Sequence, residues 1–152
     1  MRWGVVVLLL AAVAIQVLPY GRVHTNPPVV AEPRWDSPRT RALFLRACGD
    51  CHSHLTVWPW YSHIAPVSWW IARDVREGRK EFNVSTWGAT ESEGDDAAEV
   101  VRAGRMPPRL YVLLRPAAQL SAGDTQDLIR GLDATFGGER PQEEDGPPAE
   151  GE

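Results

Sequence analysis

The stretch CGDCHSH contains the only two cysteines of the chain, three positions apart and followed directly by a histidine. Three kinds of site fit this arrangement. A redox disulfide uses the two thiols but does not need the histidine. A zinc site needs four ligands, so it would have to recruit His54, His63 or a carboxylate. Covalent haem attachment uses all three residues, with Cys48 and Cys51 as thioethers and His52 as the proximal iron ligand.

A lone methionine stands in the stretch GRMPPRLY, and it is the only one apart from the initiator. In a core, methionine usually fills gaps between other side chains. Here two prolines follow it, and they stiffen the loop and remove two backbone donors. A thioether also pairs with histidine as an axial ligand in c-type cytochromes. We therefore predict Met106 as the sixth iron ligand, with His54 and His63 as rivals that otherwise take surface or hydrogen-bonding roles.

Several aromatic residues follow in the stretch LTVWPWYSHIAPVSWW, where Pro59 and Pro66 interrupt any regular element. Trp58, Trp60 and Tyr61 show neither a strand period nor a helix period. They could form an aromatic patch of the core or a loop that wraps a porphyrin edge. The two interpretations merge when haem is itself the core, so we count all three as candidate cofactor-binding residues.

Helix signals recur along the chain and would position these residues. Ser37 and Pro38 predict a helix start that leads through Ala47 into Cys48. The other expected helices run from about Pro66 to Glu77 with Gly78 as a stop, from an Asp95 or Asp96 cap to Gly104, and from a Ser121 cap to Gly137. Gly131, in the last helix, would permit the close crossing of first and last helices that small c-type cytochromes show.

The N-terminus is apolar, with no charged side chain among the 18 residues from Trp3 to Tyr20. As a helix this stretch would span about 27 Å, close to the ~30 Å core of a bilayer. A signal peptide cleaved after the sequence AVA is the rival interpretation. We predict an uncleaved transmembrane anchor over residues 1–20. It would hold the protein at the cytoplasmic membrane with the domain on the periplasmic or extracellular side, where covalent haem attachment normally takes place.

The remaining chain divides by composition. Residues 21–35 are rich in proline and predict an extended linker, and residues 36–137 hold the helix signals of one domain. Residues 138–152 cannot build a core, and we predict a disordered acidic tail. The last 14 residues carry six acidic side chains and one arginine, so they account for the net charge of −4. Nothing in the chain suggests a nucleic-acid-binding stripe.

The chain resembles a bacterial family known as the haem-binding domain, which is related to cytochrome c. Three stretches carry the resemblance, namely CGDCHSHLTVWPWYSHIAPVSW, EGRKEFNVSTW and GRMPPRLY, and the match as a whole spans roughly residues 36–132. The preceding IQVLPYGRVHTNPP is similar as well. The resemblance implies Cys48 and Cys51 as thioether sites, His52 as proximal ligand and Met106 as distal ligand.

We therefore predict a small all-α, cytochrome-c-like domain around one covalently attached haem c, preceded by a single transmembrane helix. An iron with two protein ligands leaves no open site for a substrate. This favours one-electron transfer to redox partner proteins of the membrane or periplasm over enzymatic turnover. Two alternatives remain open. One is a haem sensor or peroxidase-like protein with an open or labile sixth site, and the other is a haem-free thiol-disulfide protein.

Overall fold

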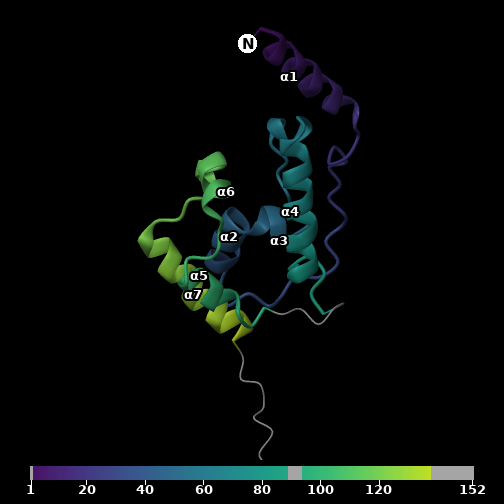
Figure 1. Cartoon of the computed structure of the whole chain (residues 1–152). Helices are drawn as coiled ribbons and strands as arrows, with labels where there is room; N and C mark the ends of the chain where they lie inside the picture. Colours follow the sequence, from purple (N-terminus) through teal and green to yellow (C-terminus); the bar gives the residue numbers. More distant parts are fainter. Residues whose placement is uncertain (1, 89–93, 138–152) are drawn as a thin grey trace, which may run out of the picture.

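The computed structural model describes residues 2–88 and 94–137, which form helices joined by turns and contain no β-strand (Figure 1). The helices are α1 (Arg2–Ala14), α2 (Pro38–Ala47), α3 (Gly49–His52), α4 (Val67–Glu81), α5 (Ala97–Arg102), α6 (Arg109–Leu114) and α7 (Ala122–Phe136). Three 3-10 turns accompany them, η1 (Ile15–Val17), η2 (Trp60–His63) and η3 (Pro116–Ala118). The predicted helical class is therefore confirmed for the described residues, and the predicted tail lies outside them.

Both predicted serine caps are present at the starts of the first and last domain helices. The Ser37 hydroxyl accepts a hydrogen bond from the backbone N–H of Thr40 at 3.1 Å, at the start of α2. The Ser121 hydroxyl accepts one from the N–H of Asp124 at 3.0 Å, at the start of α7. Each bond satisfies a donor that the first helical turn would otherwise leave unpaired.

The hydrophobic core lies mainly where α2, α5 and α7 meet. Its buried residues are Leu43, Phe44, Phe82, Val84, Ala98, Val101, Leu128, Ile129 and Leu132. Helices α2 and α7 cross at Gly131, where an added Cβ would stand only 2.1 Å from the Thr40 hydroxyl oxygen. The expected close approach of the first and last domain helices at this glycine is therefore present.

Helix α4 is longer than the sequence predicts, because it continues through Gly78 to Glu81. Gly78 is not a stop signal but the point where α4 packs against α3. An added Cβ there would lie 2.7 Å from the carbonyl oxygen of Cys51 and 2.9 Å from its Cβ. A glycine in the helix interior is needed here because two backbones approach each other closely.

The predicted transmembrane helix is wrong. The apolar stretch forms only the 13-residue helix α1, all of it exposed, and then the short turn η1. Among the described residues no helix is long and apolar enough to cross a membrane. After η1 the chain turns extended at Leu18, before Pro19, and the Gln16 side chain pairs with both backbone groups of Ala65 at 2.9 and 3.0 Å. The expected membrane localisation rested on that helix and is corrected with it.

The segment after η1 lies along α4 and joins the body of the protein (Figure 1). The guanidinium of Arg79, on α4, donates to the carbonyl oxygens of Thr25 and Ser53 at 3.2 and 2.9 Å. Further on, Ala31 forms an isolated parallel bridge with Thr86. These contacts place the segment against both α4 and the turn that follows it.

Candidate functional site

The three residues that the sequence singles out lie on one helical turn between α2 and α4 (Figure 1). Cys48 ends α2, where its N–H donates to the Phe44 carbonyl at 2.8 Å. The carbonyl of Cys48 then accepts from the N–H groups of Cys51 and His52 at 3.1 and 3.0 Å. Both cysteines are free and half-buried. The turn therefore presents two unpaired thiols and an imidazole within five residues.

The imidazole of His52 has a defined orientation. Its Nδ1 lies 2.9 Å from the carbonyl oxygen of Phe82, the residue that ends α4. A carbonyl can only accept, so Nδ1 carries the proton and Nε2 keeps its lone pair. Burial lowers the pKa of His52, which favours the neutral ring. His52 therefore has the tautomer that a metal ligand needs, with the lone pair on Nε2.

The two thiols are held in their uncharged form. Burial raises the pKa of Cys48 to about 12, and burial together with the charge of Asp50 raises that of Cys51 to about 11. In a redox-active Cys-x-x-Cys pair, by contrast, the pKa of a thiol is normally lowered towards neutrality. Within the described residues no group of three or more His, Cys, Asp or Glu side chains could hold a metal ion, so the zinc interpretation gains no support.

His54, one rival for the sixth position, is buried and bonded through both ring nitrogens. Its Nδ1 donates to the carbonyl of Pro28 at 2.9 Å, and its Nε2 accepts from the amide of Asn83 at 3.0 Å. The Asn83 amide is oriented by a bond from the N–H of Ser85 to its oxygen at 2.9 Å. His54 thus joins the segment before α2 to the turn after α4, and neither nitrogen is free.

Met106 lies in the loop between α5 and α6 and is 36% exposed. Of the three aromatic candidates, Trp60 is 74% exposed and Tyr61 donates its hydroxyl hydrogen to the Leu114 carbonyl at 3.1 Å. Trp58 lies elsewhere, stacked on His24 with the ring centroids 4.3 Å apart. The structure therefore brings Tyr61 close to α6 and places Trp58 beside the segment that follows η1.

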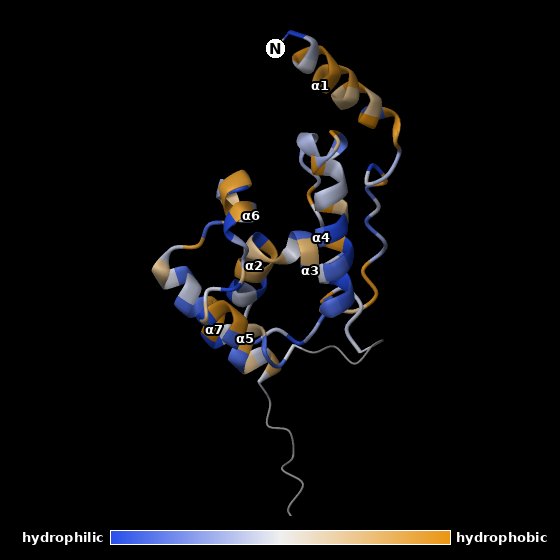
Figure 2. Cartoon of the chain, in the orientation of Figure 1, coloured by the Kyte–Doolittle hydropathy of each residue, from blue (hydrophilic) through white to orange (hydrophobic). Residues whose placement is uncertain are grey.

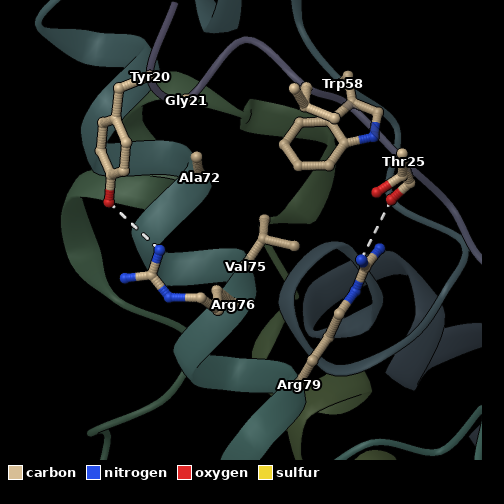
Figure 3. A pocket seen from close by; sticks show the side chains of 9 residues that line it. Tyr20, Gly21, Thr25, Trp58, Ala72, Val75, Arg76 and Arg79 are labelled. Atoms are coloured by element: carbon tan, nitrogen blue, oxygen red, sulfur yellow. Dashed lines mark hydrogen bonds between the residues drawn. The ribbon is translucent and has the colours of Figure 1, made fainter.

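A cavity of about 320 Å³ separates that segment from α4, and Trp58 lines it (Figure 3). Its other lining residues are Tyr20, Gly21, Val23, Thr25, Ala72, Val75, Arg76 and Arg79. Figure 3 shows Tyr20 and Trp58 at opposite sides, with Val75 between them. Arg76 donates to the Tyr20 hydroxyl at 3.2 Å, and Arg79 is bonded to Thr25, so both guanidinium groups already have partners in the chain.

Large apolar side chains remain uncovered on the elements around α3. In η2, α4 and α6 and the residues beside them, the exposed ones are Trp60, Ile64, Trp70, Leu110, Leu113 and Leu114. Figure 2 shows α6 as a strongly apolar helix that none of the other labelled helices covers.

Sequence reasoning missed the residues that hold the site together. The backbone carbonyl of Phe82 orients His52, and a carbonyl leaves no trace in a sequence pattern. Asp50 was overlooked although it stands between the two cysteines, and its carboxylate contacts Tyr111 and Arg115 at 2.9 and 3.1 Å. An acidic residue inside the motif was the one available signal.

Comparison with known proteins agrees with the geometry. A sequence model for a family described as a haem-binding domain matches residues 10–134, which is most of the chain. Comparisons with curated proteins and with solved structures gave no significant match. The family match begins within α1, ends within α7 and includes all the candidate residues described above.

Proposed function

The chain belongs to the haem-binding domain family, and we propose that it is a c-type haem protein that carries single electrons. In this proposal Cys48 and Cys51 form the thioether bonds, and His52 and Met106 hold the iron. When bound, haem supplies a reversible one-electron couple, and a methionine ligand favours its ferrous state.

The observation that carries the proposal is the tautomer of His52, with the lone pair on Nε2, on the same turn as two unpaired thiols. The bond from Nδ1 to the Phe82 carbonyl fixes the tautomer and aims the ring. Metal-bound histidines normally make such a bond with their second nitrogen. A redox disulfide would not explain why this histidine is prepared in this way, and the described residues offer no group of ligands for a zinc site.

The uncharged form of the two thiols argues against the alternative of a haem-free thiol-disulfide protein. Thiol-disulfide exchange starts from a thiolate, and both cysteines have a raised pKa. Their burial instead suits cysteines that form thioether bonds to a cofactor in an apolar site. The uncovered side chains of η2, α4 and α6 offer the apolar surface that a flat cofactor would need.

Electron transfer fits better than substrate turnover because Met106 is available as a second iron ligand. His54 is not, since its ring is engaged in hydrogen bonds. Both nitrogens of His54 have partners, whereas the Met106 side chain stands in a loop stiffened by Pro107 and Pro108. With two protein ligands on the iron, no position stays open for a substrate. The partners would be redox proteins that approach an exposed edge of the cofactor.

Covalent attachment is the feature to test first. The full chain is produced with a cytochrome c maturation system, denatured and extracted with acidified acetone. We expect haem to stay with the chain and its pyridine haemochrome to be c-type. Cys51→Ala should leave at most one thioether, with a lower yield, while Gly123→Ala, whose added methyl would have the Ser121 hydroxyl oxygen at 3.9 Å as its nearest neighbour, should behave like the wild type. Haem that extracts freely, or a chain without haem, would contradict the proposal.

A further inference from the structure

Helix α6 is attached to the body of the protein in an unusual way. None of its six residues is buried, and beyond its neighbour η3 it meets the rest of the described chain through single side-chain contacts, one of which is the bond from the Tyr61 hydroxyl to the Leu114 carbonyl at 3.1 Å. A helix of this length is not stable by itself. The position of α6 therefore depends on a few side-chain contacts and not on the hydrophobic core.

The main contacts converge on the carboxylate of Asp50. The Tyr111 hydroxyl, on α6, donates to its Oδ2 at 2.9 Å, and Arg115, at the end of α6, places its Nε 3.1 Å from the same oxygen. The other oxygen, Oδ1, accepts from the N–H of Val57 at 2.8 Å. The Asp50 side chain is only 13% exposed, so these bonds are largely shielded from water.

The charges in this cluster determine which groups donate hydrogen bonds and which accept them. Burial and the neighbouring Asp50 carboxylate raise the pKa of Tyr111, so its phenol stays protonated and donates. Arg115 also donates to the Val57 carbonyl at 3.0 Å, which extends the cluster. Hydrogen bonds to an ionised carboxylate are stronger than those between neutral groups. Asp50 is thus the acceptor that ties α6 to the turn carrying the two cysteines.

The same contacts fix the loop that carries Met106. On one side Pro107 and Pro108 connect Met106 to α6 with little conformational freedom. On the other side the N–H of Arg105 donates to the Val100 carbonyl at 3.0 Å, at the end of α5. The loop therefore has two anchors, and one of them is the bond network around Asp50.

We propose that Asp50 is a positioning residue for the sixth iron ligand, holding α6, and through it Met106, at a fixed place relative to the Cys48–His52 turn. This inference rests on the proposed function, in which Met106 binds the iron. It gives the residue between the two cysteines a role in holding the loop that carries Met106. Loss of the carboxylate would free α6, and with it the loop that carries Met106, while Cys48, Cys51 and His52 would keep their places.

The test compares Asp50→Asn and Tyr111→Phe with Asp133→Asn, each in the haem-loaded full chain. Asp133 is a matched control because it pairs with Arg102 at 2.8 Å between α5 and α7, away from α6. Three readouts are needed: thioether-bound haem per chain, the methionine-to-iron band with the rate of carbon monoxide binding, and hydrogen exchange of residues 105–115.

We expect haem content to be unchanged in all variants. Asp50→Asn should weaken the methionine-to-iron band and increase the carbon monoxide binding rate about tenfold, since a charge-assisted bond is lost. Tyr111→Phe should act in the same direction but less, because one hydrogen bond is lost and the ion pair stays. Both should accelerate hydrogen exchange in α6, and Asp133→Asn should match the wild type in all three readouts.

The proposal would be overturned by an Asp50→Asn protein that carries its full haem and matches the wild type in three properties. These are the methionine-to-iron band, the rate of carbon monoxide binding and the hydrogen exchange of α6. If Asp50→Asn fails to mature, Tyr111→Phe decides in the same way, because it leaves the cysteine turn intact. Failure of the proposed function looks different, since the wild type itself would then lack covalent haem or the methionine band. Even then, unchanged α6 exchange in the variants would refute the tether, and faster exchange would support it.

Discussion

Gly78 of α4 lies directly against Cys51, so closely that an added Cβ would stand 2.7 Å from the Cys51 carbonyl oxygen. The obstacle is backbone and cannot rotate away. This contact sets how near α4 comes to the turn that bears the cysteines and His52. Helices α3 and α4 can therefore approach this closely only because residue 78 has no side chain.

Gly78→Ala should destabilise the protein although alanine is the better helix former. The propensity gain is about 1 kcal/mol, but overpacking against a fixed backbone reaches about 3 kcal/mol, so we expect a net loss of up to about 2 kcal/mol. Chemical denaturation of the haem-loaded protein, followed by circular dichroism, measures it. Gly123→Ala is the matched control, because its nearest neighbour is the Ser121 hydroxyl oxygen at 3.9 Å. Equal stability of the two variants would refute the steric role of Gly78.

Gly131→Ala should have a related effect at the crossing of α2 and α7. The added methyl would meet the buried Thr40 side chain at 2.1–2.8 Å, and we expect a loss of about 1–3 kcal/mol. Here the obstacle is a side chain, so Thr40→Ala in the same protein should restore part of the lost stability. A double-mutant cycle measures this coupling. Strictly additive effects would show that the two residues do not meet at the crossing.

His54→Ala should lower stability without changing the haem spectrum. It removes two hydrogen bonds and leaves the carbonyl of Pro28 and the amide of Asn83 without their partner, which we expect to cost about 2 kcal/mol. His63→Ala, at an exposed position, should change neither property. Thermal unfolding and absorption spectra of the two variants provide the comparison. A shifted spectrum in His54→Ala alone would instead make His54 an iron ligand.

The features that the sequence revealed correctly are those with local causes. A serine cap acts on an N–H three positions away, so Ser37 and Ser121 mark helix starts wherever the rest of the chain lies. The meaning of Gly78 depends instead on a contact with Cys51, far along the chain, and the same glycine would otherwise be a reasonable helix stop. The prediction that Gly78 ends the helix is wrong because a local sequence pattern does not contain this tertiary contact.

The N-terminal segment shows the same limit. Its apolar run is long enough for a span, but the helix ends at Ala14 and Gln16 turns to the backbone of Ala65, 49 positions away. No periodicity or composition encodes that partner. The carbonyl of Phe82 beside His52 is equally invisible, although the motif alone predicts His52 as a candidate ligand.

Met106→Ala is the variant that separates electron transfer from ligand-binding chemistry. The wild type should be low-spin in the ferric state, show the weak near-infrared band of methionine-to-iron charge transfer and bind carbon monoxide slowly. The variant should lose the band, bind carbon monoxide readily and have a lower reduction potential, since a thioether favours ferrous iron.

Met106→His is the informative companion to Met106→Ala. An imidazole at this position should restore a low-spin ferric spectrum without the near-infrared band, and the potential should stay below that of the wild type because a thioether is missing. Absorption spectra and redox titrations of the three proteins measure these differences. A wild type that is high-spin and binds carbon monoxide as fast as Met106→Ala would make Met106 a packing residue. The sensor or peroxidase-like alternative would then explain the protein better than electron transfer.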